Sequence, residues 1–304
     1  MIKQSKIHIF FLFSLGLMVF GHVGIALYQG HPPSTKTSQK AMGQGGSAKA
    51  FGFVAPQGNH FSVANVKELD SVFKQWDFDL KKAKSEGKAP RLYLAKLPND
   101  MKGQKTAANS TFIRALLPHI LKVNEQILSD RERLLDMKKR QKAGGHLRHA
   151  EKMWLKKLAS EYRCKSTKIE ALLAHVDIVP PSLALSQGMI ETGGGKSHAA
   201  IKKNSTFGIM ATKTKVAKFE SLLANVTAYI LNLNRHAAYK SFREIRAKMR
   251  VQDQKLCPHK LAAELKNYSI RKAAYIKDVQ SVIRKYDLTS YDHITLDQHI
   301  RVKP

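Results

Sequence analysis

Glu191 is the side chain whose setting in this sequence best suits acid–base chemistry. It ends the segment LALSQGMIE, residues 183–191, and three glycines follow at 193–195. The segment predicts a short helix, and the negative end of a helix dipole disfavours a carboxylate, so we expect the pKa of Glu191 to be raised. A carboxyl group that keeps its proton near neutral pH suits a general acid. The competing interpretation is a solvated carboxylate in a glycine-rich loop.

The helix that carries this carboxylate must be held in place, and its sequence indicates how. Pro180 and Pro181 stop the preceding element, and Ser182 is a good N-cap residue. Ala184 and Gly188 are small and lie four residues apart, on one face of the helix. We therefore expect another helix to pack closely against this face.

No other motif in the sequence indicates a phosphate-binding, metal-binding or nucleic-acid-binding site. TGGGKS, residues 192–197, looks like a phosphate-binding loop, but the first required glycine falls at Ile190 and the glycines follow a helix instead of a strand. His198 and His236 lack metal-ligand spacing and are interpreted as surface or core residues, so we expect no metal and no cofactor. Basic segments such as REIRAKMR show no helix-turn-helix or aromatic-interleaved pattern, so we expect no nucleic-acid partner.

The charge balance indicates an anionic partner. The 304 residues include 52 Lys and Arg against 23 Asp and Glu, a net charge of +29. Nucleic acid, an anionic membrane surface and an acidic cell-wall polymer all fit this excess. Hydrophobic residues make up 43% of the chain, enough for a core. Two cysteines exclude a disulfide-rich scaffold and a four-cysteine zinc site.

The N-terminus predicts export. Residues 7–28 contain no charged side chain, and Lys3 and Lys6 precede them, which favours an uncleaved transmembrane signal-anchor with residues 1–6 in the cytoplasm. A cleaved signal peptide and a buried apolar helix are the alternatives. Residues 29–65 predict a flexible basic linker. The body would then lie in the periplasm or outside the cell, held at the inner membrane, where a Cys164–Cys257 disulfide is an alternative to two separate thiols.

The body of the chain reads as mainly α-helical. Residues 66–165 predict a helical N-terminal extension, in which 66–87 form one amphipathic helix and a longer helix from about 106 is kinked at Pro118. Residues 91–100 predict an extended segment. A second unit spans residues 166–290 and includes a hairpin-like segment at 204–219. The tail, residues 291–304, is expected to be irregular or strand-like.

Three segments of this second unit follow one another: VPPSLALSQGMIETGGGKSHAA, then NSTFGI, then KFESLLANVTAYILNLNRHAAYKSFR. Together they resemble the glucosaminidase-domain family, glycoside hydrolase family 73, in its Bax-type branch. Tyr268, Arg271 and Tyr275 match a further segment of that branch. The resemblance covers residues 91–286 in the right order. It implies a lysozyme-like helical domain with a short β-hairpin-like element. It also implies cleavage of the β-1,4 bond after N-acetylglucosamine in the glycan strands of peptidoglycan.

The resemblance also assigns roles to individual residues. Glu191 matches the catalytic glutamate of the family, which would protonate the leaving glycosidic oxygen. The substrate-binding residues that it implies are Tyr229, Tyr239, Phe207, Gly208 and Ser197. Either tyrosine is open to the alternative of a core residue.

The sequence departs from the family pattern at two points that matter for chemistry. Gly194 stands where the family has a tryptophan, and Lys215 stands at about the position of the second acid in the hairpin. Glu220 is the only acidic residue between Glu191 and Glu244, so it is the local candidate for a second catalytic carboxylate. The alternatives are that Glu220 simply starts the next helix, or that the N-acetyl group of the substrate acts as the nucleophile.

These departures leave three hypotheses. The first is a peptidoglycan hydrolase of weak activity. The second is a catalytically degenerate relative that binds glycan strands. The third is an exported basic adaptor for an anionic lipid or polymer.

Overall fold

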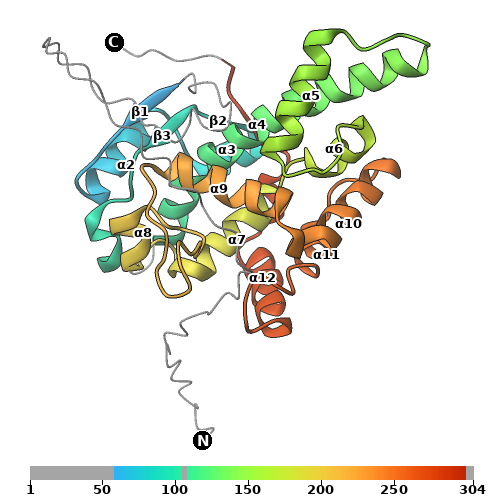
Figure 1. The fold of residues 1–304 in the computed structure, drawn as a ribbon. Helices are drawn as coiled ribbons and strands as arrows, with labels where there is room; N and C mark the ends of the chain where they lie inside the picture. Colours follow the sequence, from blue (N-terminus) through green and yellow to red (C-terminus); the bar gives the residue numbers. More distant parts are fainter. Residues whose placement is uncertain (1–57, 105–107, 299–304) are drawn as a thin grey trace, which may run out of the picture.

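The computed structural model describes residues 58–104 and 108–298, and this part of the chain is mainly helical, as expected (Figure 1). The predicted membrane anchor at 7–28 and nearly all of the predicted linker lie outside the described residues. Among the helices of the described part, none is both long enough and apolar enough to cross a bilayer. The helices of these residues are α2 (Val66–Gln75), α3 (Leu80–Glu86), η1 (Asn99–Gly103), α4 (Ala108–Lys142), α5 (His149–Glu161), α6 (Ile169–His175), α7 (Pro181–Thr192), α8 (His198–Lys203), α9 (Leu222–Arg235), η2 (Ala237–Tyr239), α10 (Lys240–Val251), α11 (Pro258–Ala262), α12 (Ala273–Lys285) and η3 (Leu288–Tyr291).

Two small parallel sheets join distant parts of the chain. Strand β1 (Asn59–Phe61) pairs with β3 (Leu92–Leu94), with Asn59 opposite Leu92. Strand β2 (Lys88–Ala89) pairs with β4 (Thr295–Leu296). The extended segment predicted over residues 91–100 is confirmed at Leu92–Leu94, and the strand-like tail at Thr295–Leu296; residues 299–304 lie outside the described part. Through β4 the tail closes on the N-terminal part of the body.

The predicted hairpin is reduced to one antiparallel bridge between Met210 and Val216. Backbone hydrogen bonds from Ala217 N to Ile209 O (2.8 Å) and from Ala211 N to Lys215 O (2.8 Å) close it. We call residues 209–218 the hairpin.

The helix predicted over residues 66–87 is wrong, because the chain breaks there into α2 and α3. Asp77 adopts a left-handed backbone conformation (φ 53°), and Phe78 N donates to Phe73 O at 2.8 Å. The carboxylate of Asp79 then accepts from the backbone of Lys81 and Lys82 and starts α3. This turn brings the Phe78 ring edge-on to Phe73, with centroids 5.6 Å apart, so both apolar faces stay buried.

Helix α7 is buried along almost its whole length. As expected, another helix packs closely on its small residues: a Cβ built on Gly188 would lie 3.2 Å from the ring of Phe112 in α4. The predicted N-cap role of Ser182 is wrong, because α7 starts one residue earlier, at Pro181. Instead, Ser182 donates from its backbone N and its Oγ to the carboxylate of Asp292, both at 2.8 Å. A side chain 110 residues away thus satisfies the start of this helix.

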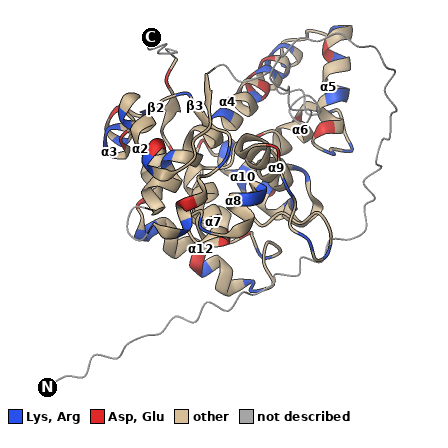
Figure 2. Ribbon diagram, turned by 90° about the vertical axis from the view of Figure 1, so that its left-hand side faces the viewer, with Lys and Arg blue, Asp and Glu red and all other residues tan. Residues whose placement is uncertain are grey.

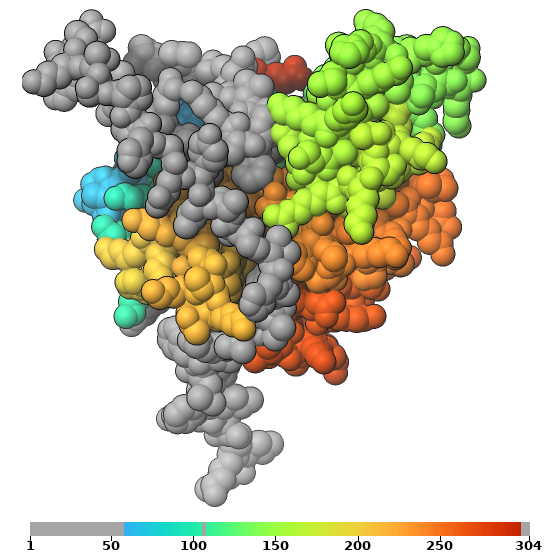
Figure 3. Space-filling view, viewed as in Figure 1, coloured from blue at the N-terminus to red at the C-terminus, as the bar shows by residue number. Residues whose placement is uncertain are grey.

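One hydrophobic core runs through residues on both sides of position 165. Helix α4 lies against both α7 and α9, and it continues unbroken through Pro118. The projection in green in Figure 3 contains α5 and α6, whose buried residues Leu155, Leu158, Ile169 and Leu172 belong to the same core. Cys164 and Cys257 are free thiols.

A buried charge cluster fixes the chain just before α7. The carboxylate of Asp177 accepts from the guanidinium of Arg250 at 2.9 and 3.0 Å. The fully buried Arg246 donates to the carbonyl oxygens of Asp177 (3.1 Å) and Ile178 (3.0 Å) and to Asn234 Oδ1 (2.7 Å). Because buried charges need such partners, this cluster ties α9 and α10 to the entry of α7.

Candidate active site

Glu191 lies in the last turn of α7 and points its carboxyl group into a partly buried site. Burial raises its pKa to about 7, and a hydrogen bond from Tyr275 and the charge of Arg271 act against that rise. The predicted direction is therefore right. The largest cause is burial, because the charged form loses its hydration, and not the helix dipole invoked from the sequence.

A hydrogen-bond chain inside the protein leads to this carboxyl group. Tyr229 Oη donates to Gln187 Oε1 at 2.7 Å, and Gln187 Nε2 donates to Tyr275 Oη at 3.0 Å. With its acceptor side occupied by Gln187, the Tyr275 hydroxyl is left to donate its proton to Glu191. The chain orients the Tyr275 proton, and with it the carboxyl group of Glu191.

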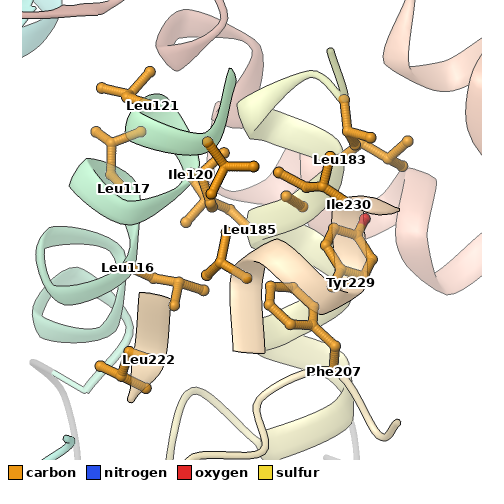
Figure 4. Packing of buried hydrophobic residues seen from close by; sticks show 14 of the residues in the cluster. Leu116, Leu117, Ile120, Leu121, Leu183, Leu185, Phe207, Leu222, Tyr229 and Ile230 are labelled. Carbon is orange, nitrogen blue, oxygen red and sulfur yellow. The ribbon is translucent and has the colours of Figure 1, made fainter. Parts of the chain in front are cut away.

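Stacked aromatic rings form the support beneath this chain. The rings of Phe207 and Tyr229 are stacked with centroids 3.9 Å apart (Figure 4). The rings of Tyr268 and Tyr275 are also stacked, at 5.4 Å, and Tyr268 Oη donates to the carbonyl of Phe207 at 2.8 Å. The ring of Tyr239 lies 6.2 Å from that of Tyr268. Burial, together with the nearby charge of Glu191, raises the pKa of these four tyrosines, so each remains a donor at neutral pH.

Gly208 brings the backbone directly against the carboxyl group. Its φ is 63°, a conformation that favours glycine, and a Cβ built on it would lie 2.7 Å from Glu191 Oε2. Any side chain here would push the carboxyl group aside. Gly208 thus limits the position of the carboxyl group directly, and Phe207 acts through Tyr229, the ring on which it stacks.

The glycine loop after Glu191 explains why the family tryptophan is absent. Gly194 has a φ of +73°, and a Cβ built on it would overlap Asn109 Oδ1. Asn109, in α4, donates from Nδ2 to Tyr286 Oη at 2.8 Å. A Cβ on Gly195 would lie 2.7 Å from the ring of Phe112. The space that a tryptophan would need is taken by α4.

The structure places the remaining predicted residues as follows. Ser197 is the N-cap of α8, where its side chain accepts from Ala200 N at 3.1 Å. Glu220 is exposed and directly precedes Ser221, the N-cap of α9, the place expected of a residue that starts the next helix. Neither side chain belongs to the hydrogen-bond chain or the aromatic cluster described above. Lys215 is exposed on the hairpin.

Burial decides what the predicted aromatic residues can do. Phe207 and Tyr229 are fully buried and Tyr239 is 1% exposed. In this conformation none of the three offers a surface to a sugar, so the alternative of core residues applies, and we interpret them as support for Glu191.

Sequence reasoning left Tyr275, Gln187 and Arg271 out of the candidate site. A signal for each was present. Gln187 lies four residues before Glu191, which puts both on one face of a helix. Tyr275 and Arg271 belong to the segment YSIRKAAY, which carries part of the family resemblance. Within the described residues, no cluster of three or more His, Cys, Asp or Glu side chains is arranged to hold a metal.

Comparison with known proteins identifies the family of the chain. Residues 167–288 match the family model described as "Glucosaminidase: Mannosyl-glycoprotein endo-beta-N-acetylglucosaminidase". The chain belongs to the glucosaminidase-domain family, a class of glycoside hydrolases, in its Bax-type branch. It is 32% identical over 186 residues to protein bax of Escherichia coli (strain K12), an alignment that covers 56% of this chain and 66% of that protein. No solved structure matches the chain significantly.

Proposed function

We propose that this protein is a peptidoglycan hydrolase that cleaves the β-1,4 bond after N-acetylglucosamine, with Glu191 as the general acid. The supporting observation is the carboxyl group of Glu191, whose pKa burial raises to about 7. About half of such groups are protonated at pH 7, compared with about one in 300 for a glutamic acid of ordinary pKa. A carboxyl group that keeps its proton near neutral pH is what protonation of a leaving glycosidic oxygen requires.

The second catalytic group has two candidate routes. An enzyme with two carboxylates needs a base or nucleophile on the far side of the sugar, and Glu220 is the acidic residue nearest in sequence to the hairpin. The other route uses the N-acetyl group of the substrate as nucleophile and needs only Glu191 from the protein. The exposed place of Glu220 before α9 favours the second route.

The alternative function is a glycan-binding relative without hydrolase activity. Two observations favour it: Lys215 replaces the second acid, and Gly194 replaces the tryptophan that would stack on a sugar. We further propose that residues 7–28 anchor the protein in the inner membrane, with its body in the periplasm or outside the cell, where peptidoglycan is present.

Digestion of purified peptidoglycan separates these functions. The hydrolase predicts new reducing ends that mass spectrometry identifies as N-acetylglucosamine. The glycan-binding relative predicts that the protein sediments with insoluble peptidoglycan and releases no new ends. N-acetylmuramic acid at the new ends would contradict the proposed bond specificity.

A further inference from the structure

A run of lysines follows the candidate acid. Between Glu191 and Glu220 the chain contains six lysines and no acidic residue. Helix α8 carries two of them, Lys202 and Lys203, and its Lys and Arg residues are blue in Figure 2. Lys213, Lys215 and Lys218 are exposed on the hairpin. We call these last three the cationic arm.

The hairpin that carries the cationic arm begins one residue after Gly208, which lies against the carboxyl group of Glu191. The bond from Ala217 N to Ile209 O closes the hairpin at that point. Lys213 is five residues from Gly208, so their Cα atoms are at most about 17 Å apart even in an extended chain. The arm is therefore carried by a short segment that starts next to the candidate acid, within reach of a long glycan strand bound there.

The other end of the hairpin is held by α8. Phe219 N donates to Lys203 O at 2.8 Å, and Asn204 Nδ2 donates to Phe219 O at 3.1 Å. The lysines of α8 thus adjoin the root of the arm and add to its field. Among the ion pairs of residues 58–104 and 108–298, none involves a lysine of the arm.

We propose that the cationic arm selects glycan strands that still carry their peptide stems, through the carboxylates of those stems. This inference rests on the proposed function, because it concerns the substrate of the same site. A strand stripped of its stems keeps a single carboxylate on each muramic acid, the lactyl group that the amidase frees, whereas an intact stem carries several carboxylates that extend away from the sugars. Exposed charges act weakly one at a time, but several lysines facing a multiply charged strand add up, and salt screens them over about 8 Å at physiological ionic strength.

The test compares two forms of one substrate: intact peptidoglycan strands, and the same strands stripped of stems by an amidase. We expect the wild type to show a kcat/KM about tenfold higher on intact strands at low salt, with the preference lost in 0.5 M NaCl, as for a few exposed charge pairs. The triple variant Lys213→Gln, Lys215→Gln, Lys218→Gln should cleave both forms at the wild-type rate for stripped strands. The matched control, Lys139→Gln, Lys152→Gln, Lys156→Gln, removes the same charge from α4 and α5 and should keep the preference.

Binding separates failure of the inference from failure of the proposed function. Co-sedimentation of Glu191→Gln with intact and stripped strands, with and without the triple change in the arm, needs no catalysis. If the wild type cleaves neither substrate but binding to intact strands depends on the arm, the hydrolase proposal fails and the proposed role of the arm in strand selection stands. The inference would be overturned if the wild type cleaved intact and stripped strands with the same kcat/KM. It would also be overturned if the control variant lost the preference as completely as the triple variant of the arm.

Discussion

At the scale of single residues, the raised pKa of Glu191 carries a cost in stability. Its pKa is about 7 in the folded chain, against a usual 4.5. The folded state therefore binds more protons than the unfolded state between these values, and the free energy of unfolding falls as the pH rises through that window. Stability is given up for a protonated acid at neutral pH, a trade that is common at active sites.

Glu191→Gln should remove this cost. We expect the variant to be more stable than the wild type by about 1–3 kcal/mol at pH 8, because it never becomes charged, and equally stable at pH 4. Urea denaturation at both pH values measures the difference. Glu220→Gln, at an exposed position, serves as the control for the change of Glu to Gln itself. A gain for Glu191→Gln that is the same at pH 4 and pH 8 would contradict the assigned pKa.

Sequence reasoning found the acid but not the residues that orient it. Glu191 was predicted from its place at a helix end, and Phe207 and Gly208 from the family resemblance. The structure places Gly208 against Glu191 and stacks Phe207 on Tyr229. Tyr275 lies 88 residues from Gln187, and no local pattern reveals a hydrogen bond over such a separation. Burial of Glu191, the main cause of its pKa, likewise depends on packing that the helix pattern alone does not contain.

At the scale of elements, the glycine loop between α7 and α8 is shaped around α4. Gly194 needs a positive φ, and Asn109 fills the space beside it. The loop packs against α4 in this way only with a glycine at position 194. Placing the family tryptophan there should therefore not create the sugar-stacking surface that it provides in the family.

Gly194→Trp tests this interpretation. Forcing a side chain into the left-handed region costs about 1–2 kcal/mol, and the overlap with Asn109 adds to that. We expect a loss of at least about 2 kcal/mol in the free energy of unfolding and no gain in activity. Gly193→Trp is the matched control, since nothing lies within 4 Å of a Cβ at that glycine. The interpretation fails if Gly194→Trp is as stable as the control or cleaves peptidoglycan faster than the wild type.

Most helices could be predicted from apolar periodicity and from glycine and proline breaks. The starts of α3 and α7 could not. The spacing of apolar residues continues from Phe73 to Leu80, so periodicity alone gives no sign of the turn at Asp77. The start of α7 is satisfied by Asp292 from the far end of the chain. At α7 a tertiary contact decides what local preference leaves open, whereas α3 starts at a local cap, the carboxylate of Asp79.

At the scale of the whole molecule, the proposed hydrolysis of peptidoglycan requires that the body of the protein reaches the cell wall. The net charge of +29 suits an acidic polymer there. The predicted anchor at residues 7–28 would hold the body at the membrane, with Lys3 and Lys6 in the cytoplasm.

A reporter fused after Pro304 tests this topology. An enzyme that is active only after export, such as one that needs an oxidised disulfide, should be active in the fusion and inactive when residues 1–28 are deleted. A reporter that works only in the cytoplasm should show the opposite pattern. Activity of the cytoplasmic reporter in the full-length fusion would contradict the proposed location.

The central claim is that Glu191 supplies the proton for cleavage of the glycan, and the rate of Glu191→Gln on purified peptidoglycan tests it most directly. Gln keeps the size of the side chain and removes the transferable proton. We expect the rate at which new reducing ends are released to fall by at least about a hundredfold, the usual scale for loss of a general acid. Circular dichroism should show that the fold of the variant is intact. Release by Glu191→Gln at close to the wild-type rate would contradict the central claim.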